Sequence, residues 1–355
     1  MTPPRPPAPA SAPPAPAPRR LLLLTDGALT HASSRTRAAG YLPALAAAGY
    51  RPVWRPRTGE PARAREDRLR FAFEKRVCGA RMRLALRARW DAVFAQRIVL
   101  PASALARLAR RGTPLVYDFD DALYLQDEAG VGRMVEAASA VVVASPELAG
   151  FARAHGKEPV VLPTPVDTDV LRPAARLPVR FTIGWIGSPW TTRYLDAFAD
   201  VLEDAAHATG ARLLLVGADP AIRARLPGAD VVPWALDTEA QLLGEMTVGV
   251  MPLTGDAWSV GKGAFKLYQY MAAGLPVVAS PVGVNRSVVA PGENGFLAET
   301  PAEWAAAFNA LARSPDLARR LGSTGRRHAV ERYSVAACAT RLVGVLDTVL
   351  PPRLR

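Results

Sequence analysis

The sequence predicts an α/β fold made of two doubly wound, Rossmann-like domains that face each other across a cleft. Short apolar runs alternate with longer amphipathic stretches, which is typical of parallel sheets whose strands are joined by helices. The alternation stops in a proline-containing stretch, 163–180, and then starts again. The length of 355 residues suits two domains, and half of the residues are apolar, so each domain can bury a core.

We expect four segments along the chain. Residues 1–18 contain nine Pro and five Ala, a composition that cannot pack, so we expect a disordered leader. The apolar run behind it, Leu21–Leu24, is too short for a secretory signal. The first domain then covers 19–172 and the second 173–333. Residues 334–355 form a C-terminal helix, for which we consider a return to the first domain.

The elements of the first domain follow from its apolar runs. Strands are expected in "RLLLLTD", "RPVW", "ASAVVVAS" and "EPVVLPTPVD", and at Leu115–Tyr117, which breaks into the acidic loop "DFDD". "SSRTRAAGYLPALAAAGY" has helical periodicity, with Ser33 or Ser34 as its N-cap and Gly49 near its end.

The same alternation predicts the second domain. Its expected strands are "FTIGWIGSP", "ARLLLVGAD", "ADVVPW", "VGVMPL" and "LPVVASPVG". Its expected helices are "TTRYLDAFADVLEDAAHATG", "GAFKLYQYMAAG" with Gly274 at its C-cap, and the closing helices from Thr300 onward. Because ligands of such sheets lie outside the carboxyl ends of the strands, the cleft between the domains is the expected site.

Composition excludes several classes of protein. No run of about 18 apolar residues is present, so no transmembrane helix is expected. Cys78 and Cys338 lie far apart and the four His are scattered, which fits no metal site and favours a reduced, cytoplasmic setting. Neither the turn at Gly27 nor the turn at Gly187 has the G-x-G-x-x-G pattern, and no P-loop is present, so a dinucleotide oxidoreductase is disfavoured.

A basic segment, 61–97, contributes much of the formal net charge of +12. It carries eleven Lys and Arg against four Asp and Glu, and apolar residues such as Phe73, Leu84 and Phe94 are interleaved with the charges. This pattern is typical of a basic helix on a membrane surface. An arginine-rich outer helix packed on a sheet explains it equally well. Nucleic acid, the usual competing partner of a basic chain, is disfavoured.

Two lysines point to an anion site. Forty Arg accompany only four Lys, and two of these, Lys262 and Lys266, lie in "GKGAFKLYQYMAAG". Lys262 just precedes the expected helix and Lys266 is about one turn inside it, where backbone N–H groups also attract anions. A compact ammonium suits some sites better than a planar guanidinium. The pair predicts a pyrophosphate site, with chance placement on a solvated face as the alternative.

The stretch "KLYQYMAAGLPVVASPVGVN", followed by "VVAPGENGFLAE", resembles the donor-binding region of retaining GT-B glycosyltransferases of the sucrose-synthase-like group, which are similar to glycosyltransferase family 4. The match is close over 266–298 and weaker over most of the chain from Arg20 onward. The resemblance implies a GT-B architecture, with an acceptor-side domain at 19–172 and a donor domain at 173–333. It also implies transfer from a nucleoside-diphosphate sugar with retention of configuration, without an essential metal or other cofactor.

The resemblance implies a donor site in the second domain. In the family, a pair of Glu eight residues apart contacts the sugar and the ribose; here these positions are Gly261 and Gln269, so both charges are missing. Asp256, five residues before Gly261, is a candidate substitute. The other donor-binding candidates are Gly187, Ser188, Thr192, Arg193 and Gly283.

The resemblance also implies a role for the acidic loop of the first domain. Many relatives carry a His there that touches the transferred sugar, and its position falls on Asp120. We take Asp120, with Lys262 and Lys266, as the catalytic candidates. "DFD" also resembles the D-x-D metal clamp of GT-A glycosyltransferases, and the simplest alternative is an acidic turn that caps a helix or pairs with the basic segment.

The turn after the first strand supplies further candidates for contact with the donor phosphate or the acceptor, with N-capping and surface charge as the alternatives. These are Gly27, His31, Ser33, Ser34, Arg35 and Arg37. Trp185, Trp190 and Trp234 lie at strand ends of the second domain. One of them is a candidate for stacking on the base of the nucleotide, and the alternative is that all three are core residues.

We therefore expect a cytoplasmic glycosyltransferase that uses a nucleoside-diphosphate sugar and makes peripheral contact with the inner membrane face if the basic segment binds lipid. Its acceptor is a glycan, a lipid-linked molecule or a small molecule. One alternative is a nucleotide-sugar epimerase or hydrolase on the same fold. The other is a degenerate protein that binds a sugar nucleotide or glycan without turnover, which the missing Glu pair keeps open.

Overall fold

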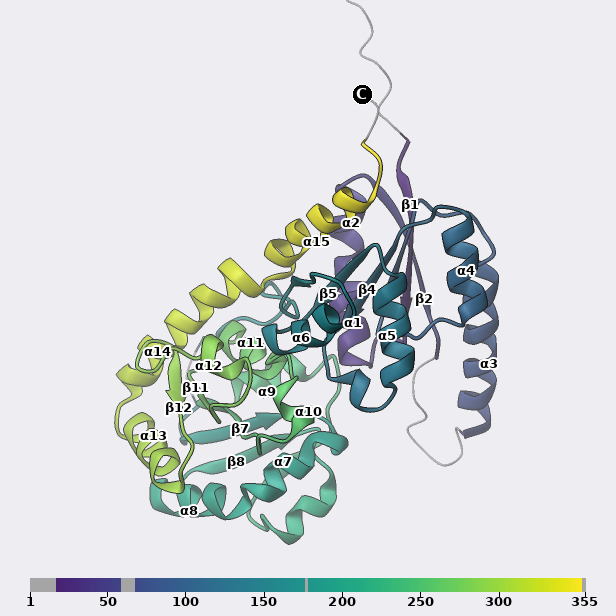
Figure 1. Ribbon diagram of the computed structural model, residues 1–355. Helices are drawn as coiled ribbons and strands as arrows, with labels where there is room; N and C mark the ends of the chain where they lie inside the picture. The colour runs from purple at the N-terminus through teal and green to yellow at the C-terminus, as the bar shows by residue number, and fades with distance from the viewer. Residues whose placement is uncertain (1–16, 59–67, 176–177, 353–355) are drawn as a thin grey trace, which may run out of the picture.

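The structure, a computed structural model, describes residues 17–58, 68–175 and 178–352. Residues 1–16, most of the expected leader, lie outside them, as does part of the basic segment. The chain forms two α/β domains, each built around a parallel six-stranded sheet with helices on its faces (Figure 1). The predicted fold of two doubly wound domains is confirmed.

The first sheet has the strand order β2-β1-β3-β4-β5-β6. Its strands are β1 (Arg19–Thr25), β2 (Tyr50–Pro56), β3 (Ala92–Gln96), β4 (Leu115–Phe119), β5 (Ala140–Val143) and β6 (Val160–Val161). Its helices are α1 (Ala32–Arg37), α2 (Leu42–Ala47), α3 (Arg68–Ala85), α4 (Ala102–Arg110), α5 (Glu128–Ala137) and α6 (Pro146–Ala154). The order reverses between β1 and β3, which makes this pair the switch point of the sheet.

The second sheet has the order β12-β11-β10-β7-β8-β9, so its switch point lies between β7 and β10. Its strands are β7 (Thr182–Ile186), β8 (Arg212–Val216), β9 (Asp230–Val232), β10 (Val248–Met251), β11 (Val277–Ala279) and β12 (Gly295–Leu297). Its helices are α7 (Thr192–Ala197), α8 (Ala199–Thr209), α9 (Glu239–Gly244), α10 (Ala257–Val260), α11 (Phe265–Ala272), α12 (Asn285–Val288), α13 (Pro301–Arg313) and α14 (Pro315–His328).

The central strand β3 corrects the interpretation of the basic segment. Residues 61–97 are not one helix, because α3 ends at Ala85 and the chain then enters the middle of the first sheet. Val93 and Phe94 are buried there between β1 and β4 instead of lying among surface charges. A strand that is buried on both faces does not alternate between apolar and polar residues. The five residues of β3 therefore lack the sequence pattern that would mark them as a strand.

The helix expected after β1 is also corrected. It is broken into α1, a short 3₁₀ turn and α2, because Ala38 leaves the helical region with φ −136° and ψ −65°. The N-cap is His31 rather than Ser33 or Ser34, and its ring accepts a hydrogen bond from the backbone N–H of Ser34. The Ser34 hydroxyl instead accepts from the N–H of Gly27 at 3.2 Å, which ties α1 to the turn after β1.

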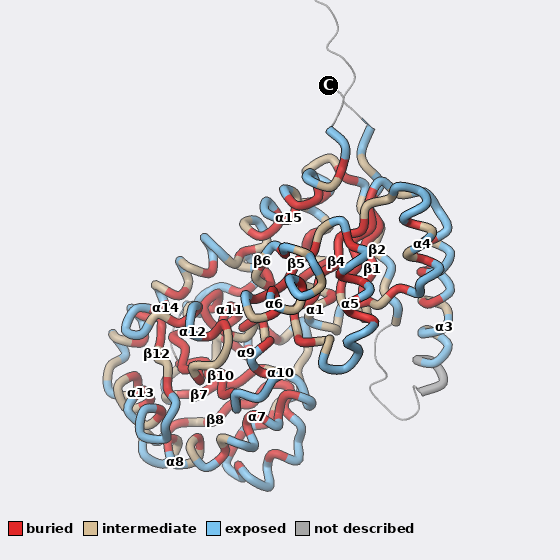
Figure 2. Tube along the Cα trace, in the orientation of Figure 1, coloured by how far each residue is buried: buried red, intermediate tan, exposed pale blue. Residues whose placement is uncertain are grey.

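The last helix, α15 (Val335–Val349), packs on the first domain, although it follows the second domain in the chain (Figures 1 and 2). Its buried residues Cys338, Leu342 and Leu346 share a core with β1 and α2. The two passages between the domains lie side by side, because Val166 N–H donates to the carbonyl of Tyr333 at 2.8 Å. Within the described part of the chain, no helix has both the length and the apolar character needed to cross a bilayer.

A buried ion pair holds the first domain together behind the cleft. Arg37 in α1 and Asp118 in β4 are each 1% exposed. Arg37 Nε donates to Asp118 Oδ1 at 2.9 Å and Nη2 donates to Oδ2 at 2.6 Å, a bidentate geometry. Arg37 Nη1 donates to the carbonyl of Leu162 and to the Thr164 hydroxyl, which lie in the segment leaving β6. Burial alone would lower the pKa of Arg37, but the Asp118 carboxylate outweighs burial and raises it, so the guanidinium stays charged.

We expect Arg37→Met to lower the free energy of unfolding of the first domain by about 3–5 kcal/mol, because it leaves the Asp118 carboxylate buried without a partner. The control is the double variant Arg37→Met/Asp118→Leu, which removes both charges and should recover most of the loss. Thermal and urea unfolding of the three proteins measure the effect. Equal stability of the single variant and the parent would contradict this assignment.

Candidate functional site

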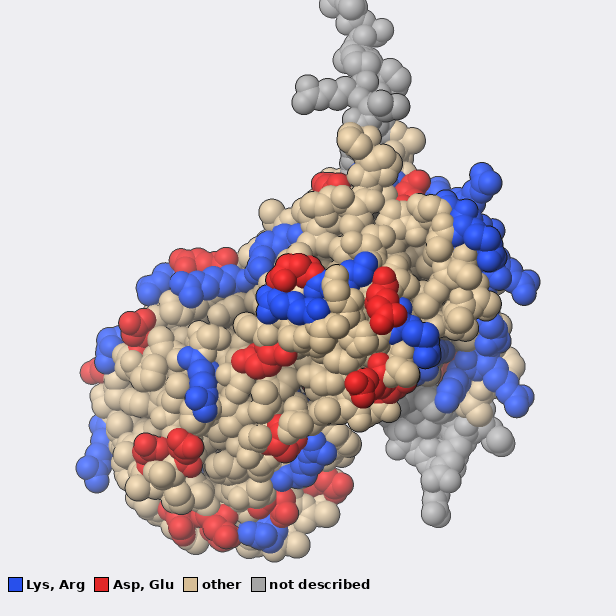
Figure 3. Space-filling model, in the orientation of Figure 1, with Lys and Arg blue, Asp and Glu red and all other residues tan. Residues whose placement is uncertain are grey.

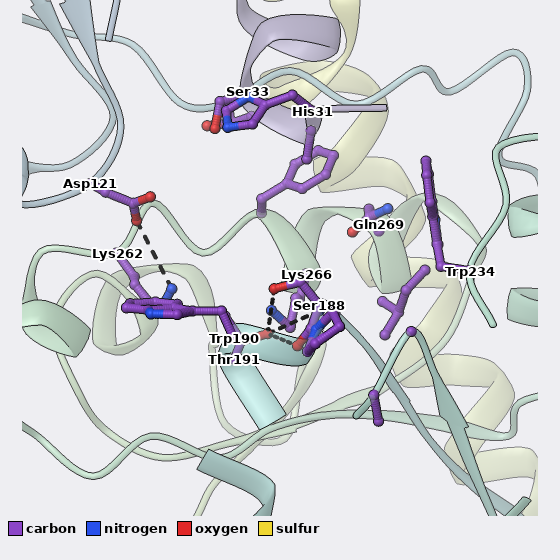
Figure 4. A pocket seen from close by; sticks show the side chains of 18 of the residues that line it. His31, Ser33, Asp121, Ser188, Trp190, Thr191, Trp234, Lys262, Lys266 and Gln269 are labelled. Atoms are coloured by element: carbon purple, nitrogen blue, oxygen red, sulfur yellow. Dashed lines mark hydrogen bonds and ion pairs between the residues drawn. The ribbon is translucent and has the colours of Figure 1, made fainter. Parts of the chain in front are cut away.

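The two switch points face each other across the interdomain cleft and enclose a cavity of about 1000 Å³. From the first domain, the segments after β1, β3 and β4 line it. From the second domain, the segments after β7, β8 and β9, the end of β10 and the start of α11 line it. The site predicted between the domains is therefore a real hollow, and Figure 4 shows the side chains that point into it.

The turn after β7 presents backbone to the cavity. Gly187 has no room for a side chain, because a Cβ atom there would meet Trp185 and the hydroxyl of Thr191. The N–H of Ser188 pairs with Thr191 Oγ1 at 3.0 Å, which fixes the turn in a capping box. This turn is therefore a pre-formed stretch of main chain at the floor of the cavity.

Lys262 and Lys266 both reach the cavity from the second domain. Ala264, between them, is the N-cap of α11 and has a left-handed conformation with φ 55°. That kink separates the two side chains. Lys262 extends across the cleft to Asp121, with Nζ 3.9 Å from Oδ1 (Figure 4). Lys266 lies over the ring of Trp185, with Nζ 5.2 Å from the ring centre. Lys266 forms no hydrogen bond or ion pair with any residue that the structure describes.

The ammonium group of Lys266 has a perturbed pKa. Burial is the first cause and the neighbouring Lys262 ammonium the second, and together they lower the pKa to about 7 against the opposing effect of Asp121. An uncompensated cation held in a half-buried site favours an anion, which would restore the charged form.

The acidic loop after β4 lies opposite the lysines. Asp120 is 8% exposed, lines the cavity and accepts a hydrogen bond from Arg97 Nη1 at 2.9 Å, while the same guanidinium binds Asp121 Oδ2 at 2.5 Å. Burial alone would raise the pKa of Asp120, but Arg97 and then Arg37 outweigh burial and keep that pKa below its usual value. Asp120 is therefore an ionised hydrogen-bond acceptor.

Backbone strain gathers at this cavity. Within the described ranges, Arg97 and Ala264 are the two residues other than glycine with positive φ, at 58° and 55°, and both line the cavity. Such conformations cost about 1–3 kcal/mol each and persist where the surrounding structure enforces them, often at functional sites. The conformation of Arg97 directs its own guanidinium to the cavity, and that of Ala264 helps to place the neighbouring Lys262 and Lys266 there.

The far end of the cavity is closed by a contact between the domains. Arg35 of α1 lies 4.9 Å from the centre of the Trp234 ring and 3.6 Å from the carboxylate of Glu239. Trp234 Nε1 donates to Glu239 Oε2 at 2.6 Å. Gln269, 4% exposed, lines the same end of the cavity (Figure 4).

His31 lines the cavity above the lysines (Figure 4). Its ring caps α1 through the N–H of Ser34 and lies 3.0 Å from the Ser34 hydroxyl. Burial and the nearby Arg97 lower the pKa of His31, so the ring is neutral at neutral pH and acts as a hydrogen-bonding group.

The structure brings nine of the predicted site residues to the cavity wall. These are Asp120, Lys262, Lys266, Gly187, Ser188, Gln269, His31, Ser33 and Arg35. The other predicted site residues lie behind or beside the wall: Gly27, Ser34, Arg37, Thr192, Arg193, Asp256, Gly261 and Gly283.

The residues behind the wall have structural partners. Asp256 caps α10 by accepting from the N–H groups of Trp258 and Ser259, so its carboxylate is already engaged. Thr192 joins two loops, accepting from the N–H of Asp219 at 2.8 Å. Arg193 stacks on Trp190, with its guanidinium carbon 3.9 Å from the ring centre.

Gly261 has a steric reason to be glycine. A Cβ atom there would lie 2.9 Å from the Cβ of Ala122 and 3.1 Å from Leu148 Cδ2, both in the first domain. The glutamate that the resemblance implies at this position has no space in this arrangement. Gly283 is similarly confined, with φ 51° and the carbonyl of Val260 beside it.

Sequence reasoning missed Arg97, Glu239, Arg223 and Trp258, which all line the cavity. Arg97 directly follows β3, so recognising that strand would have placed it at the carboxyl edge of the sheet. The others lie in loops whose place depends on how the domains meet. Two of the three tryptophans expected near the base, Trp190 and Trp234, line the cavity, whereas Trp185 is a buried core residue.

Comparison with known proteins identifies the second domain. Residues 180–314 match the family described as glycosyl transferases group 1. The chain is 35% identical over 83 residues to spore coat protein SA of Bacillus subtilis, covering 22% of each chain. It is 34% identical over 114 residues to the MMP α-(1→4)-mannosyltransferase of Mycolicibacterium hassiacum, covering 31% of this chain and 26% of that one. The chain thus aligns with about a quarter of the length of these curated relatives.

Solved structures share the whole fold. Sucrose-phosphate synthase of Thermosynechococcus elongatus superposes with a TM-score of 0.68 at 17% identity, over 93% of this chain and 99% of that one. Anabaena HepE in complex with UDP and glucose superposes with a TM-score of 0.65 at 15% identity, over 92% and 99%. The GT-B architecture and the resemblance to GT-B glycosyltransferases are confirmed, and the matched region is a glycosyl transferase group 1 domain. The GT-A alternative for "DFD" is wrong at the level of the fold.

We expect a nucleoside diphosphate, whose phosphates are already ionised at pH 8, to bind with proton uptake at that pH, because an anion beside Lys266 raises the pKa of its ammonium from about 7 towards its usual value. Affinity should fall as the pH rises above 7. In the ligand-free protein, stability should rise between pH 7 and 10.5, because the unfolded state then binds more protons. Calorimetry in two buffers with different ionisation enthalpies measures the uptake.

Lys266→Arg is the matched control for that titration. A guanidinium stays charged throughout this range, so the variant should bind the nucleoside diphosphate without taking up a proton, and more weakly, because the larger planar group suits a site for an ammonium less well. Proton uptake of the same size in the variant would show that another group is responsible.

Proposed function

We propose that this chain is a GT-B glycosyltransferase that moves a sugar from a nucleoside-diphosphate sugar to an acceptor with retention of configuration. The observation that carries the proposal is the unpaired ammonium of Lys266, beside Lys262, at the start of a helix that opens on the interdomain cavity. Ammonium groups and helix N-terminal N–H groups together form a site for a diphosphate.

The shape of the cavity supports a nucleoside-diphosphate sugar as the donor. Its ends are marked by Trp234 and by Trp190, with Lys266 between them (Figure 4). A nucleoside fits the Trp234 end, where Gln269 offers an amide that both donates and accepts hydrogen bonds to ribose hydroxyls. The sugar then lies towards Asp120 and Lys262. HepE, which has the same fold, was solved with UDP and glucose.

The described residues supply the chemistry of the leaving group. Negative charge grows on the diphosphate as the glycosyl bond breaks, and Lys262 and Lys266, at the start of α11, form a fixed positive environment for it. Asp120, held ionised by Arg97, faces the sugar end and accepts hydrogen bonds from sugar hydroxyls or stabilises positive charge on the ring. Asp120, Lys262 and Lys266 are thus the proposed catalytic residues.

Metal independence is part of the proposal and rests on how the acidic loop is engaged. The first carboxylate of "DFD", Asp118, is buried under Arg37. The second, Asp120, is bound by Arg97. Positive side chains therefore occupy the positions where a divalent ion would bind this pair. The ion pair between Asp120 and Arg97 also agrees with the simplest alternative for this loop, an acidic turn that pairs with the basic segment, because Arg97 is the last residue of that segment.

The acceptor is a glycan, a lipid-linked molecule or a small molecule, and no nucleic acid is involved. The chain acts in the cytoplasm, with peripheral contact between segment 61–97 and the inner membrane face. An epimerase or hydrolase on the same fold, or a protein that binds sugar nucleotides without turnover, are the alternatives that the experiments must separate.

Incubation with a panel of UDP, GDP, ADP and TDP sugars should release the nucleoside diphosphate of one donor, by transfer or by slow hydrolysis. Lys266→Ala should weaken binding of that nucleoside diphosphate by about one to two powers of ten, because a charge-assisted hydrogen bond contributes roughly 1.5–3 kcal/mol. Arg320→Ala, on the outer surface of α14, is the matched control. Stabilisation against melting without release of diphosphate would support a binding protein, and epimerised donor would support the epimerase.

Activity with that donor should persist in excess EDTA, because lysines and backbone N–H groups replace a divalent ion at the diphosphate. The assay compares initial rates with and without chelator, followed by addition of Mg²⁺ or Mn²⁺. Loss of activity that either ion restores would overturn the metal-independent mechanism.

A further inference from the structure

Helix α3 has a second apolar stripe on its outer face. Its inner face packs Gly79 and Met82 towards the sheet. On the other side, Phe73 is 68% exposed and Leu84 is 67% exposed. They are eleven residues apart, which is close to three helical turns, so they lie on one line about 16 Å apart. Exposed Ala80 lies between them. We call this line the α3 ridge; it contributes nothing to the core.

Cations flank the α3 ridge. At 100° per residue, Arg76 and Arg83 lie along one side of the ridge and Arg81 along the other, and Arg87 follows in the turn after α3; all four are exposed. Arg111, the C-cap of α4, donates to the backbone carbonyl of Arg87. Figure 3 shows the resulting concentration of positive side chains over α3 and α4.

The cations that flank the ridge have no counter-charge. In the parts of the chain that the structure describes, Arg76, Arg81, Arg83 and Arg87 pair with no carboxylate. Some surface arginines elsewhere do pair, as Arg153 does with Glu158. The face therefore combines unneutralised positive charge with an apolar line.

We propose that the outer face of α3 seats this protein on an anionic lipid bilayer. Phe73 and Leu84 enter the interfacial layer, and the flanking guanidinium groups meet lipid phosphates while their apolar stems lie along the ridge. A nucleic acid would use the cations but leave Leu84 in water. An anionic bilayer complements both features of the face.

The topology places this surface near the mouth of the cleft. β2 ends at the carboxyl edge of the first sheet, and α3 runs back from that edge before β3 begins (Figure 1). The Phe73 end of the ridge therefore lies towards the cleft. Seating on lipid would present the cleft to molecules at the membrane surface, a consequence that rests on the proposed function; the lipid contact itself does not.

Flotation of the full chain with vesicles tests the proposal. The wild type should float with vesicles of phosphatidylglycerol and phosphatidylcholine in equal parts, and the bound fraction should fall at high salt. It should not bind vesicles of phosphatidylcholine alone. Arg76→Gln/Arg83→Gln should weaken partitioning about 25-fold, since each cation near the surface contributes roughly fivefold. Phe73→Ser/Leu84→Ser should weaken it at least about tenfold at unchanged charge.

The matched control is Arg319→Gln/Arg320→Gln on α14, which removes the same charge from the second domain and should partition as the wild type does. All exchanged residues are exposed, so thermal melting should show intact folding. The proposal is overturned if the wild type binds neither vesicle, if it binds both equally, if the control loses as much as the α3 variant, or if the serine variant binds fully. Salt-dependent binding of RNA without vesicle binding would also overturn it in favour of a nucleic acid.

Discussion

The arrangement of the cleft depends on the buried ion pair between Arg37 and Asp118. One guanidinium joins α1 to β4 and reaches the segment that leaves β6, so three parts of the first domain share a single anchor. Asp120 and Asp121 follow Asp118 by two and three residues. Their carboxylates can meet Arg97 and Lys262 because the end of β4 is held in place. Taking two charges out of water is costly, and the bidentate geometry with its two further acceptors offsets that cost.

Charge is distributed unevenly over the cavity, and the imbalance suits a polyanion. The first domain contributes two carboxylates that already face cations, because Asp120 and Asp121 share Arg97 and Asp121 also lies 3.9 Å from the ammonium of Lys262. The second domain contributes Lys266, which has no such match among the described residues and whose pKa is lowered by its burial and by Lys262. The ligand-free protein therefore has an unpaired positive charge in the cavity, which a bound diphosphate would neutralise. Fixed charges of this kind are also those that stabilise a leaving group without reorganisation.

Close approach of the two domains explains where the chain departs from the family pattern. Gly261 lies against Ala122 and Leu148, and a Cβ at Gly263 would lie 2.8 Å from the Cβ of Ala144. A glutamate at Gly261 would hold the domains apart. The close contact between the loop of the lysines and the acidic loop therefore leaves no space for that carboxylate.

Local pattern was enough to predict the two parallel sheets, the start of α11 and the two lysines that reach the cavity, because apolar periodicity and helix termini are encoded within short stretches. It could not predict β3, whose buried residues show no alternation, nor that His31 caps α1. Partners distant in the chain decided the rest. Arg97 belongs to the site only because β3 lies between β1 and β4, and Asp256 leaves it because its carboxylate caps α10. Spacing along the chain determined which residues lie at strand ends, and domain packing determined which of them face the cavity, because that depends on contacts between residues far apart in the sequence.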